Sequence, residues 1–438
     1  MDTATEKSHL KKETTKSDKT VDALFDVIST WHLPLIIFSV VRGFPSAMML
    51  MVAVFTAPEK QNFYCATPPE WIANEGQCTM HQNAANITDE FNITTTISSV
   101  IEEPRGVASC SAWIFDHAVY RGTTLVEEWD LVCSRRWMVS TSQSLYIFGL
   151  LFSTAIFSHV ADWYGRRKAC VISLVCSQII GLLLTWAPSM AFYNAFRFLA
   201  AVSSSGYYDA ATTLLVECVS ARRRYAVTLF AGLGWTSGMV LLPVVSYILP
   251  NWRTQHFAIA MLFAFLLALT FFMEESPRWL LEAGRFSDAR KVLTKVVRAR
   301  QKDASVSADL ENDFTVEDID NLIGNIKARG AAIPHKGKGT IADLFGKRFR
   351  HSTIVFSYSK MVAYLLWYHV TVSSVAVGLN PYLSFGLTSL CELPNRALDA
   401  IIIRTVPRRI AVAISFVVTA GSITVYYGFP ESEVPRIS

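Results

Sequence analysis

The amino-acid sequence predicts an all-α membrane protein. Charged residues make up 17% of the 438 residues, whereas a typical soluble chain has about 25%. Hydrophobic residues make up 51%, and the mean hydropathy is +0.31. Two further patterns support this class. Long apolar segments recur along the chain, and basic residues cluster in alternate connections between them.

Nine segments are apolar and long enough to cross a bilayer, whose core needs about 20 mostly apolar residues in helical form. Their ranges are 31–56, 136–161, 169–188, 191–217, 225–248, 255–273, 352–374, 382–403 and 410–428. Helices are predicted because the backbone must satisfy its own hydrogen bonds in lipid. Membrane strands would show alternating polarity, and the apolar run from Phe257 to Met273 does not alternate.

The basic residues predict how these segments are oriented. A cytoplasmic N-terminus places four basic connections on the inside of the membrane. They are 166–168, 222–224, 275–351 and 404–409. Residues 1–30 are polar and lack the short apolar stretch of a cleavable signal, so we expect them to form a cytoplasmic N-terminus.

Residues 57–135 then form a large external loop. Four cysteines on the oxidising side predict two disulfide bonds with three possible pairings, and two acceptor sequons predict N-glycosylation. The cysteines are Cys65, Cys78, Cys110 and Cys133, and the sequons begin at Asn86 and Asn92. The remaining cysteines lie in or at the spans and are expected to pack as small apolar side chains: Cys170, Cys176, Cys218 and Cys391.

A second long connection, residues 275–351, is predicted to be a cytoplasmic linker with amphipathic helices. Ser276 is a suitable N-cap, and Pro277 suits the first helical position. Apolar residues then recur at helical spacing as far as Val297, and a second helix is expected around 316–326. The linker separates a six-helix half, residues 31–274, from the last three spans, residues 352–438.

Two motifs lie at the ends of spans. The residues DWYGRR at 162–167 follow the second span, and ESPRWL at 275–280 follow the sixth. Together with the cysteine-bearing external loop, they resemble the major facilitator superfamily and, within it, the organic cation, organic anion and carnitine transporters. The resemblance implies twelve spans in two six-span halves. It also implies that small organic ions (cations, zwitterions such as carnitine, or anions) cross the plasma membrane by alternating access.

The sequence departs from the family pattern at several places. Ser158 stands where the first motif has a glycine, Glu274 replaces a proline, and the external loop has four cysteines where six are common. The second-half copy of the motif, at 404–409, has diverged. Only three spans follow the linker, so we expect a complete first half and a partial second half. The alternative function is a transport-incompetent truncated isoform that modulates a full-length relative.

The resemblance also assigns a gating role to residues at the cytoplasmic edge. Their carboxylates and guanidinium groups are expected to pair when the inside is closed and to separate when it opens. They are Asp162, Gly165, Arg166, Arg167, Glu217, Arg222, Arg223, Glu275 and Arg278. The other interpretation is that the arginines only set the topology, and the two interpretations are compatible.

Four charged residues within spans are the candidate substrate-cavity residues: Arg42, Asp209, Glu392 and Arg396. A charge at mid-membrane costs at least about 2.5–3.5 kcal/mol, so it usually faces a cavity or a partner. Arg42 and Asp209 are expected either to pair across helices or to bind substrate. Glu392 and Arg396, four residues apart, either neutralise each other or face the cavity. Glu392 resembles the cation-carrying branch and Arg396 the anion-carrying branch, so the substrate charge stays open.

The spans contain no clustered histidines, nucleophile–base pair or metal-ligand spacing. We therefore expect no enzymatic activity, no metal site and no cofactor. The expected partners are a small organic ion and the lipid bilayer, with a homo- or hetero-oligomer as a further possibility and no nucleic acid.

Overall fold

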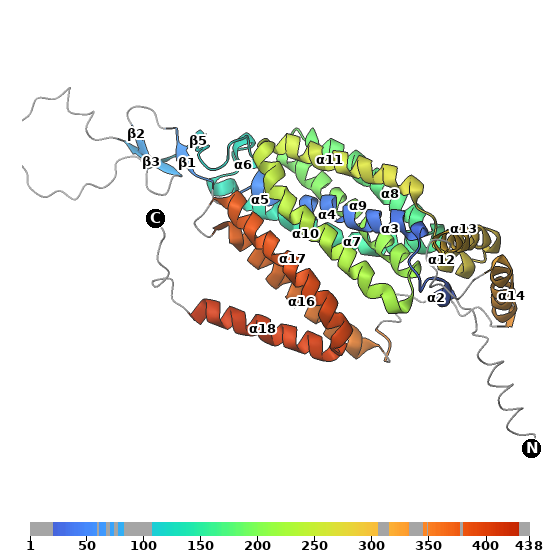
Figure 1. Ribbon diagram of the computed structural model, residues 1–438. Helices are drawn as coiled ribbons and strands as arrows, with labels where there is room; N and C mark the ends of the chain where they lie inside the picture. The colour runs from blue at the N-terminus through green and yellow to red at the C-terminus, as the bar shows by residue number, and fades with distance from the viewer. Residues whose placement is uncertain are drawn as a thin grey trace, which may run out of the picture.

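The computed structural model describes residues 21–58, 61–66, 71–73, 78–82, 107–304, 315–332, 345–347, 349–376 and 380–428. Each of the nine predicted spans overlaps helical structure, and the helices form an elongated bundle (Figure 1). Short strands lie at one end of the bundle and additional helices at the other. The strands belong to the predicted external loop, and the additional helices belong to the predicted cytoplasmic linker. Their positions at opposite ends of the bundle agree with the predicted topology.

The first half is built on the helical segments of residues 30–272. Their bounds are η1 (Thr30–His32), α3 (Leu33–Val41), α4 (Gly43–Met51), α5 (Ala53–Thr56), α7 (Trp137–Tyr164), α8 (Arg166–Thr185), α9 (Met190–Glu217), η4 (Ala221–Arg223), α10 (Arg224–Ile248), α11 (Trp252–Leu269) and η5 (Thr270–Phe272). The first span is therefore divided into short helical pieces rather than being one regular helix. Its central part is buried inside the bundle, with Met51 and Val52 fully enclosed.

The second half contributes α16 (Arg350–Ser373), η6 (Ser374–Ala376), α17 (Pro381–Thr405) and α18 (Arg408–Gly428). Helix α17 packs along α10 of the first half, whereas α18 lies apart from the first half (Figure 1). In the described part of the chain, five helical segments are long and apolar enough to cross a membrane. They are Thr30–Thr56, Cys133–Tyr164, Arg166–Thr185, Ala221–Ile248 and Trp252–Phe272. The others are shorter in their apolar part or carry more polar residues.

The external region contains two small antiparallel sheets that the sequence did not predict. The first pairs β1 (Phe63–Cys65) with β5 (Trp113–Phe115), and the second has the order β2 (Trp71–Ala73), β3 (Thr79–Gln82), β4 (Val107–Ser109). A short helix, α6 (Leu125–Glu128), and a 3-10 turn, η3 (Cys133–Arg135), then lead into α7. Asn86 and Asn92 lie outside the described residues, so their glycosylation stays a prediction.

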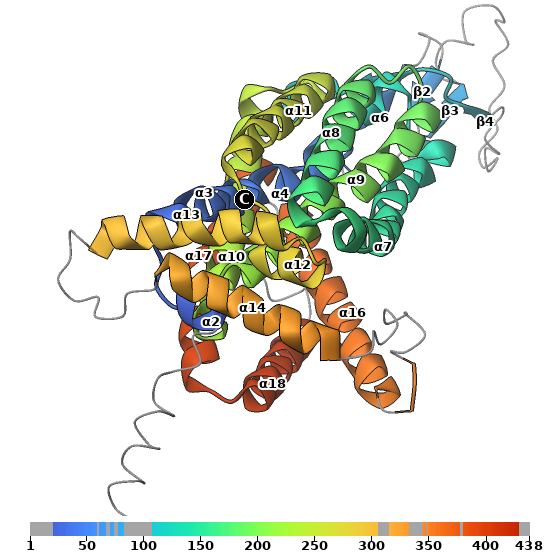
Figure 2. The same cartoon turned by 90° about the vertical axis from the view of Figure 1, so that its right-hand side faces the viewer.

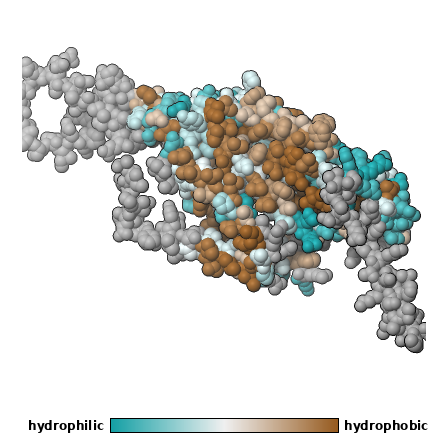
Figure 3. Space-filling view, viewed as in Figure 1, coloured by the Kyte–Doolittle hydropathy of each residue, from teal (hydrophilic) through white to brown (hydrophobic). Residues whose placement is uncertain are grey.

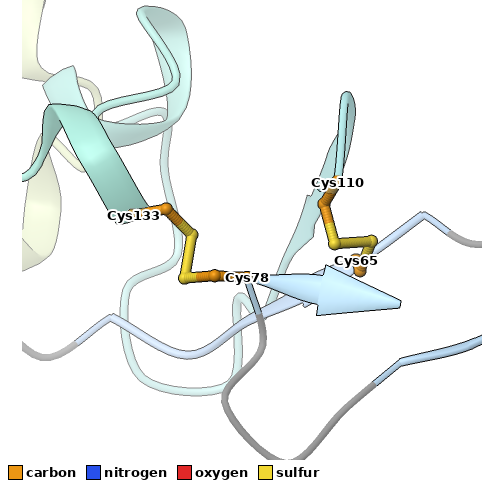
Figure 4. The surroundings of a disulfide bond; sticks show 4 residues. All are labelled: Cys65, Cys78, Cys110 and Cys133. Atoms are coloured by element: carbon orange, nitrogen blue, oxygen red, sulfur yellow. A yellow bond between two sulfur atoms is a disulfide. The ribbon is translucent and has the colours of Figure 1, made fainter. Parts of the chain in front are cut away.

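Two disulfide bonds close this region, as predicted, and the structure selects one of the three pairings. Cys65 bonds to Cys110, and Cys78 bonds to Cys133 (Figure 4). The first bond lies beside the β1–β5 pair, whose register places Cys65 opposite Trp113. The second ties the start of β3 to the segment that enters α7. The external region is thus anchored to the bundle at its base.

We expect Cys78→Ser to lower the thermal unfolding temperature and to reduce surface delivery. The bond that it removes closes a loop of 55 residues, and loops of this size contribute about 4 kcal/mol in the chain-entropy description. Non-reducing peptide mapping of the unmodified chain should recover Cys65 linked to Cys110 and Cys78 linked to Cys133. Recovery of another pairing, or an unchanged unfolding temperature, would contradict this arrangement.

The predicted cytoplasmic linker is a small helical layer formed by α12 (Pro277–Glu282), α13 (Phe286–Ala304) and α14 (Val316–Ala332). The predicted first helix is interrupted because Gly284 adopts a positive φ of 73°. An N-terminal turn, α2 (Val21–Leu24), joins this layer (Figure 2), and Leu24 and Phe25 are buried among its apolar side chains. Residues 21–29, predicted as part of a polar tail, are therefore integrated into the linker.

The molecular surface agrees with a membrane location. Apolar residues cover much of the bundle, whereas hydrophilic residues gather at the end formed by the cytoplasmic helices (Figure 3).

The unpaired cysteines correct one expectation. Cys170 and Cys218 are buried and Cys176 is half-buried, but Cys391 is exposed because it lies on the outward face of α17.

Candidate functional site

Five residues of the predicted cytoplasmic gate lie together at one end of the bundle and are called the cytoplasmic gate below: Asp162, Arg166, Arg167, Glu217 and Glu275. Helix α7 ends at Tyr164, and Gly165, with φ of 110°, turns the chain directly into α8. The arginines of the DWYGRR motif therefore form the first turn of α8 instead of lying in an open loop. This is a correction of the predicted start of the third span, and it fixes where the two guanidinium groups point.

Arg166 connects three elements at the inner edge of the bundle. Its guanidinium lies 3.0 Å from Asp162 at the end of α7 and 3.0 Å from Glu217 at the end of α9. It also donates a hydrogen bond of 2.9 Å to the backbone carbonyl of Ala161. The Arg166 side chain is 9% exposed, whereas that of Asp162 is 64% exposed. Glu217 is therefore the enclosed counter-ion, and Asp162 is available to other groups.

Arg167 ties α8 to the sixth span and to the linker. Its guanidinium donates to the carbonyl of Thr270 at 3.1 and 3.2 Å, and its backbone N–H donates to Glu275 at 2.9 Å. Glu275 thus caps the first turn of α8, where the helix dipole favours a negative charge. The Nε1–H of Trp279 on α12 donates to the Asp162 carbonyl at 3.0 Å. These contacts join both motifs of the sequence into one structure.

The outer members of the predicted gate behave differently. Arg278 pairs with Asp22 at 2.5 Å and also donates to the Val219 carbonyl at 3.4 Å, so it holds the N-terminal turn against the linker. Among the described residues, the structure gives Arg222 and Arg223 no ion pair. Their predicted pairing is therefore not found in this conformation, and their place at the cytoplasmic edge agrees with a role in topology.

We expect Glu217→Gln to destabilise the protein by about 1–3 kcal/mol, because an enclosed guanidinium loses its buried counter-ion. The effect is measured as the thermal unfolding temperature in detergent, with the loss of monodisperse protein as the signal. The matched control is Asp288→Asn, whose ion pair with Arg285 lies on the exposed linker surface and should contribute little. Equal unfolding temperatures for the two variants would contradict the proposed importance of the gate.

A second group, the central cluster, joins the two halves within the bundle. It consists of Thr236 on α10, Trp367 on α16, and Glu392 and Arg396 on α17. Glu392 pairs with Arg396 at 3.4 Å and accepts hydrogen bonds from Trp367 Nε1 at 2.9 Å and from Thr236 at 3.4 Å. Arg396 in turn donates to Thr236 at 3.3 Å. The two charges therefore form the predicted neutralising pair, and the predicted exposure of this pair to a substrate cavity stays a prediction.

Arg42 and Asp209 do not form the predicted cross-helix ion pair. Arg42 lies between α3 and α4, is fully buried, and donates to the Thr212 hydroxyl at 2.7 Å and to the backbone carbonyl of Tyr208. Asp209 is turned to the exposed side of α9, where it accepts hydrogen bonds from Thr154 at 3.3 Å and from Ser205 at 3.4 Å. The two side chains are kept apart because Arg42 contacts α9 at Tyr208 and Thr212, whereas Asp209 points from another face of α9 toward Thr154.

Aromatic rings connect Arg42 to the central cluster. The guanidinium of Arg42 lies 4.2 Å from the centre of the Tyr208 ring. The ring centres of Tyr208 and Trp235 are 6.1 Å apart, and those of Trp235 and Trp367 are also 6.1 Å apart. All three rings are half-buried. They form a continuous apolar wall with a cation at one end and an ion pair at the other.

Sequence reasoning missed one buried charge, Arg197 on α9. It is fully enclosed, lies 4.5 Å from the Tyr146 ring centre, and donates to Gln143 at 3.3 Å. Its occurrence inside an expected span was the available signal. Gln143 also lines a pocket of about 540 Å³ near the external end, between α4, α5, α7 and α16. This pocket does not include the central cluster.

The fold is that of an all-α, multi-pass membrane protein. Residues 79–328, more than half of the chain, match the family model described as Sugar (and other) transporter. The chain belongs to this family of the major facilitator superfamily. Its fold is similar to that of the E. coli xylose transporter XylE in a partially occluded inward-open conformation, with a TM-score of 0.50 and 13% identity over 86% of this chain and 73% of that one.

Curated relatives belong to solute carrier family 22, as the sequence motifs predicted. Member 12 from Mus musculus is 26% identical over 378 residues, covering 85% of this chain and 63% of the relative. Member 6 from Oryctolagus cuniculus is 27% identical over 68% of this chain and 52% of the relative. Member 3 from Mus musculus is 24% identical over 89% of this chain and 72% of the relative. The chain thus spans less than two thirds of the length of members 12 and 6, and 72% of the length of member 3.

Proposed function

We propose that this protein carries small organic ions across the plasma membrane by alternating access, with its N-terminus in the cytoplasm. The observation that carries the proposal is the position of Glu392. This carboxylate lies on α17 of the second half, yet it accepts a hydrogen bond from Thr236 on α10 of the first half. Ionisable groups inside membrane spans are costly and commonly mark a transport pathway.

The packing of the two halves supports a carrier mechanism. Helices α10 and α17 form the main contact between them, and the central cluster lies on this contact. In carriers of this fold, one half rocks against the other around a site near the middle of the membrane. A small hydrogen-bonded cluster at the contact can rearrange with such motion and with the arrival of a charged substrate.

The cytoplasmic gate supplies the second part of the proposal. Arg166, Arg167 and Glu275 hold the inner ends of α7, α8, α9 and α12 together. They make the inner edge of the first half a stiff unit, which is what rigid-body rocking requires. Asp162 remains largely exposed, and we propose that it makes and breaks contacts as the inside closes and opens.

Cellular uptake tests this proposal directly. Labelled benzyltrimethylammonium, carnitine and benzenesulfonate represent a cation, a zwitterion and an anion. We expect at least one to accumulate above untransfected cells, and Glu392→Gln to reduce its uptake about tenfold, as for the loss of one charged hydrogen-bond partner. Glu282→Gln is the matched control because Glu282 is exposed at the end of α12. Background uptake of all three ions, or full activity of Glu392→Gln, would refute the proposal.

A further inference from the structure

We propose that Arg42 binds the anionic group of the substrate, such as a sulfonate or carboxylate on a small aromatic molecule. This inference rests on the proposed transport function and specifies the charge that the first half recognises. It follows from three observations: the incomplete hydrogen bonding of a buried guanidinium, the orientation of the nearby carboxylate, and the aromatic wall beside both.

The guanidinium of Arg42 is buried without a complete set of acceptors. The side chain has no exposed surface, and its acceptors are neutral: the carbonyls of Ser39 and Tyr208 and the hydroxyl of Thr212. Its Nη2 has no hydrogen-bond partner in the part of the chain that the structure describes. A buried cation with an unused donor is costly, and an oxyanion would supply both the charge and the acceptor.

The nearby carboxylate does not fill this role. Asp209 follows Tyr208 directly in α9, yet its side chain faces Thr154 on α7 and Ser205 one turn earlier. Among the described residues, no ion pair joins it to Arg42. In the central cluster, Glu392 and Arg396 already compensate each other. Within the described ranges, no direct ion pair neutralises the charge of Arg42, which favours an anion over a cation as its ligand.

The aromatic wall indicates the rest of the ligand. Tyr208 lies against the guanidinium of Arg42, and Trp235 and Trp367 continue the wall toward Glu392. A planar aromatic ring can pack on half-buried rings of this kind while its anionic group reaches Arg42. Arg197 is a buried arginine at another place in the bundle, where its Nη2 donates to Gln143 and its guanidinium covers Tyr146, although its Nε also has no partner among the residues that the structure describes.

Binding to the purified full-length chain tests the assignment, with tritiated benzenesulfonate as the probe. We expect it to bind at least about tenfold more tightly than benzyltrimethylammonium. Loss of one charged hydrogen-bond partner predicts that Arg42→Gln weakens benzenesulfonate binding about 10- to 100-fold. Arg42→Lys keeps the charge but not the forked geometry and should fall between the two. Arg197→Gln is the matched control, because Arg197 is as deeply buried in the helical bundle as Arg42. This variant should bind benzenesulfonate as tightly as the unmodified chain does.

The outcomes separate this inference from the proposed function. The role of Arg42 is overturned if a correctly folded Arg42→Gln binds benzenesulfonate as tightly as the unmodified chain does. It is also overturned if only Arg197→Gln loses binding. Tighter binding of the cation by the unmodified chain also overturns it, while leaving organic-ion transport intact if the cation is taken up. If Arg42→Gln does not yield monodisperse protein, the ion selectivity of the unmodified chain and the affinity of Arg42→Lys decide. Absence of uptake for every ion refutes the proposed function itself.

Discussion

Replacement of Gly234 with alanine should prevent assembly of the helical bundle. A Cβ atom at this position would overlap the carbonyl oxygen of Val40 and lie 2.7 Å from its carbonyl carbon. The reciprocal position is also too close, because a Cβ on Gly43 would overlap the backbone at Gly234 and Trp235 and lie 2.9 Å from the Cα of Gly234. Both obstacles are backbone atoms, so neither helix can relieve the overlap by changing a rotamer. Close helix crossings in membranes depend on small residues in this way.

We expect Gly234→Ala to cost more than about 3 kcal/mol, the upper part of the usual range for overpacking. Yield of monodisperse protein and thermal unfolding temperature in detergent measure this loss. Gly386→Ala is the matched control. Gly386 lies on α17, where a Cβ would meet only Pro243 Cγ at 3.6 Å, an ordinary contact distance. If both variants fold equally well, the backbone contact between the first span and α10 is wrong.

Gly165→Ala should release the cytoplasmic linker from the bundle. Gly165 has φ of 110°, a conformation that L-residues rarely adopt, and its Cβ would lie 2.9 Å from Glu275 Cδ and 3.0 Å from the Trp279 ring. The backbone conformation alone costs about 1–3 kcal/mol. Displacement of Glu275 would also remove its hydrogen bond to the Arg167 backbone. We therefore expect transport to be lost and α12 to lose protection in hydrogen exchange.

Gly284→Ala separates the two contributions. Gly284 also has a positive φ, of 73°, but a Cβ there meets nothing within 4 Å. This variant should have a smaller cost, about 1 kcal/mol, and should keep α12 protected from exchange. Equal loss of protection in the two variants would show that backbone strain alone releases α12. The displacement of Glu275 would then not be the cause.

Much of this architecture could be predicted because membrane helices leave strong local signals. All nine predicted apolar segments overlap helices, and five helical segments of the described chain are long and apolar enough to cross a membrane. The partnership of Arg166 with a carboxylate was also predictable, since Glu217 lies at the corresponding edge of its span. Its geometry was not, because Gly165 shifts the start of α8 to Arg166.

Other features depend on contacts between distant residues. The four external cysteines allow three pairings, and only the packing of the strands selects Cys65 with Cys110. Gly234 carries no local signal, because the reason for its small size is Val40 on another helix. Charged residues in spans could be found, but whether Arg42 meets Asp209 depends on which faces of α9 receive Arg42 and present Asp209. The structure places the two side chains apart.

Accelerated exchange in liposomes tests the central claim, which is that the two halves alternate around the central cluster. Purified full-length chain is reconstituted, and the ion that accumulates best in cells is used as the labelled probe. A carrier whose binding site returns across the membrane faster with a bound ion than without one should show faster initial uptake into preloaded liposomes. The liposomes are preloaded with the same unlabelled ion and compared with empty ones, and the uptake should saturate at high concentration. Uptake that rises linearly with concentration and ignores the preloaded ion would indicate a pore and contradict alternating access.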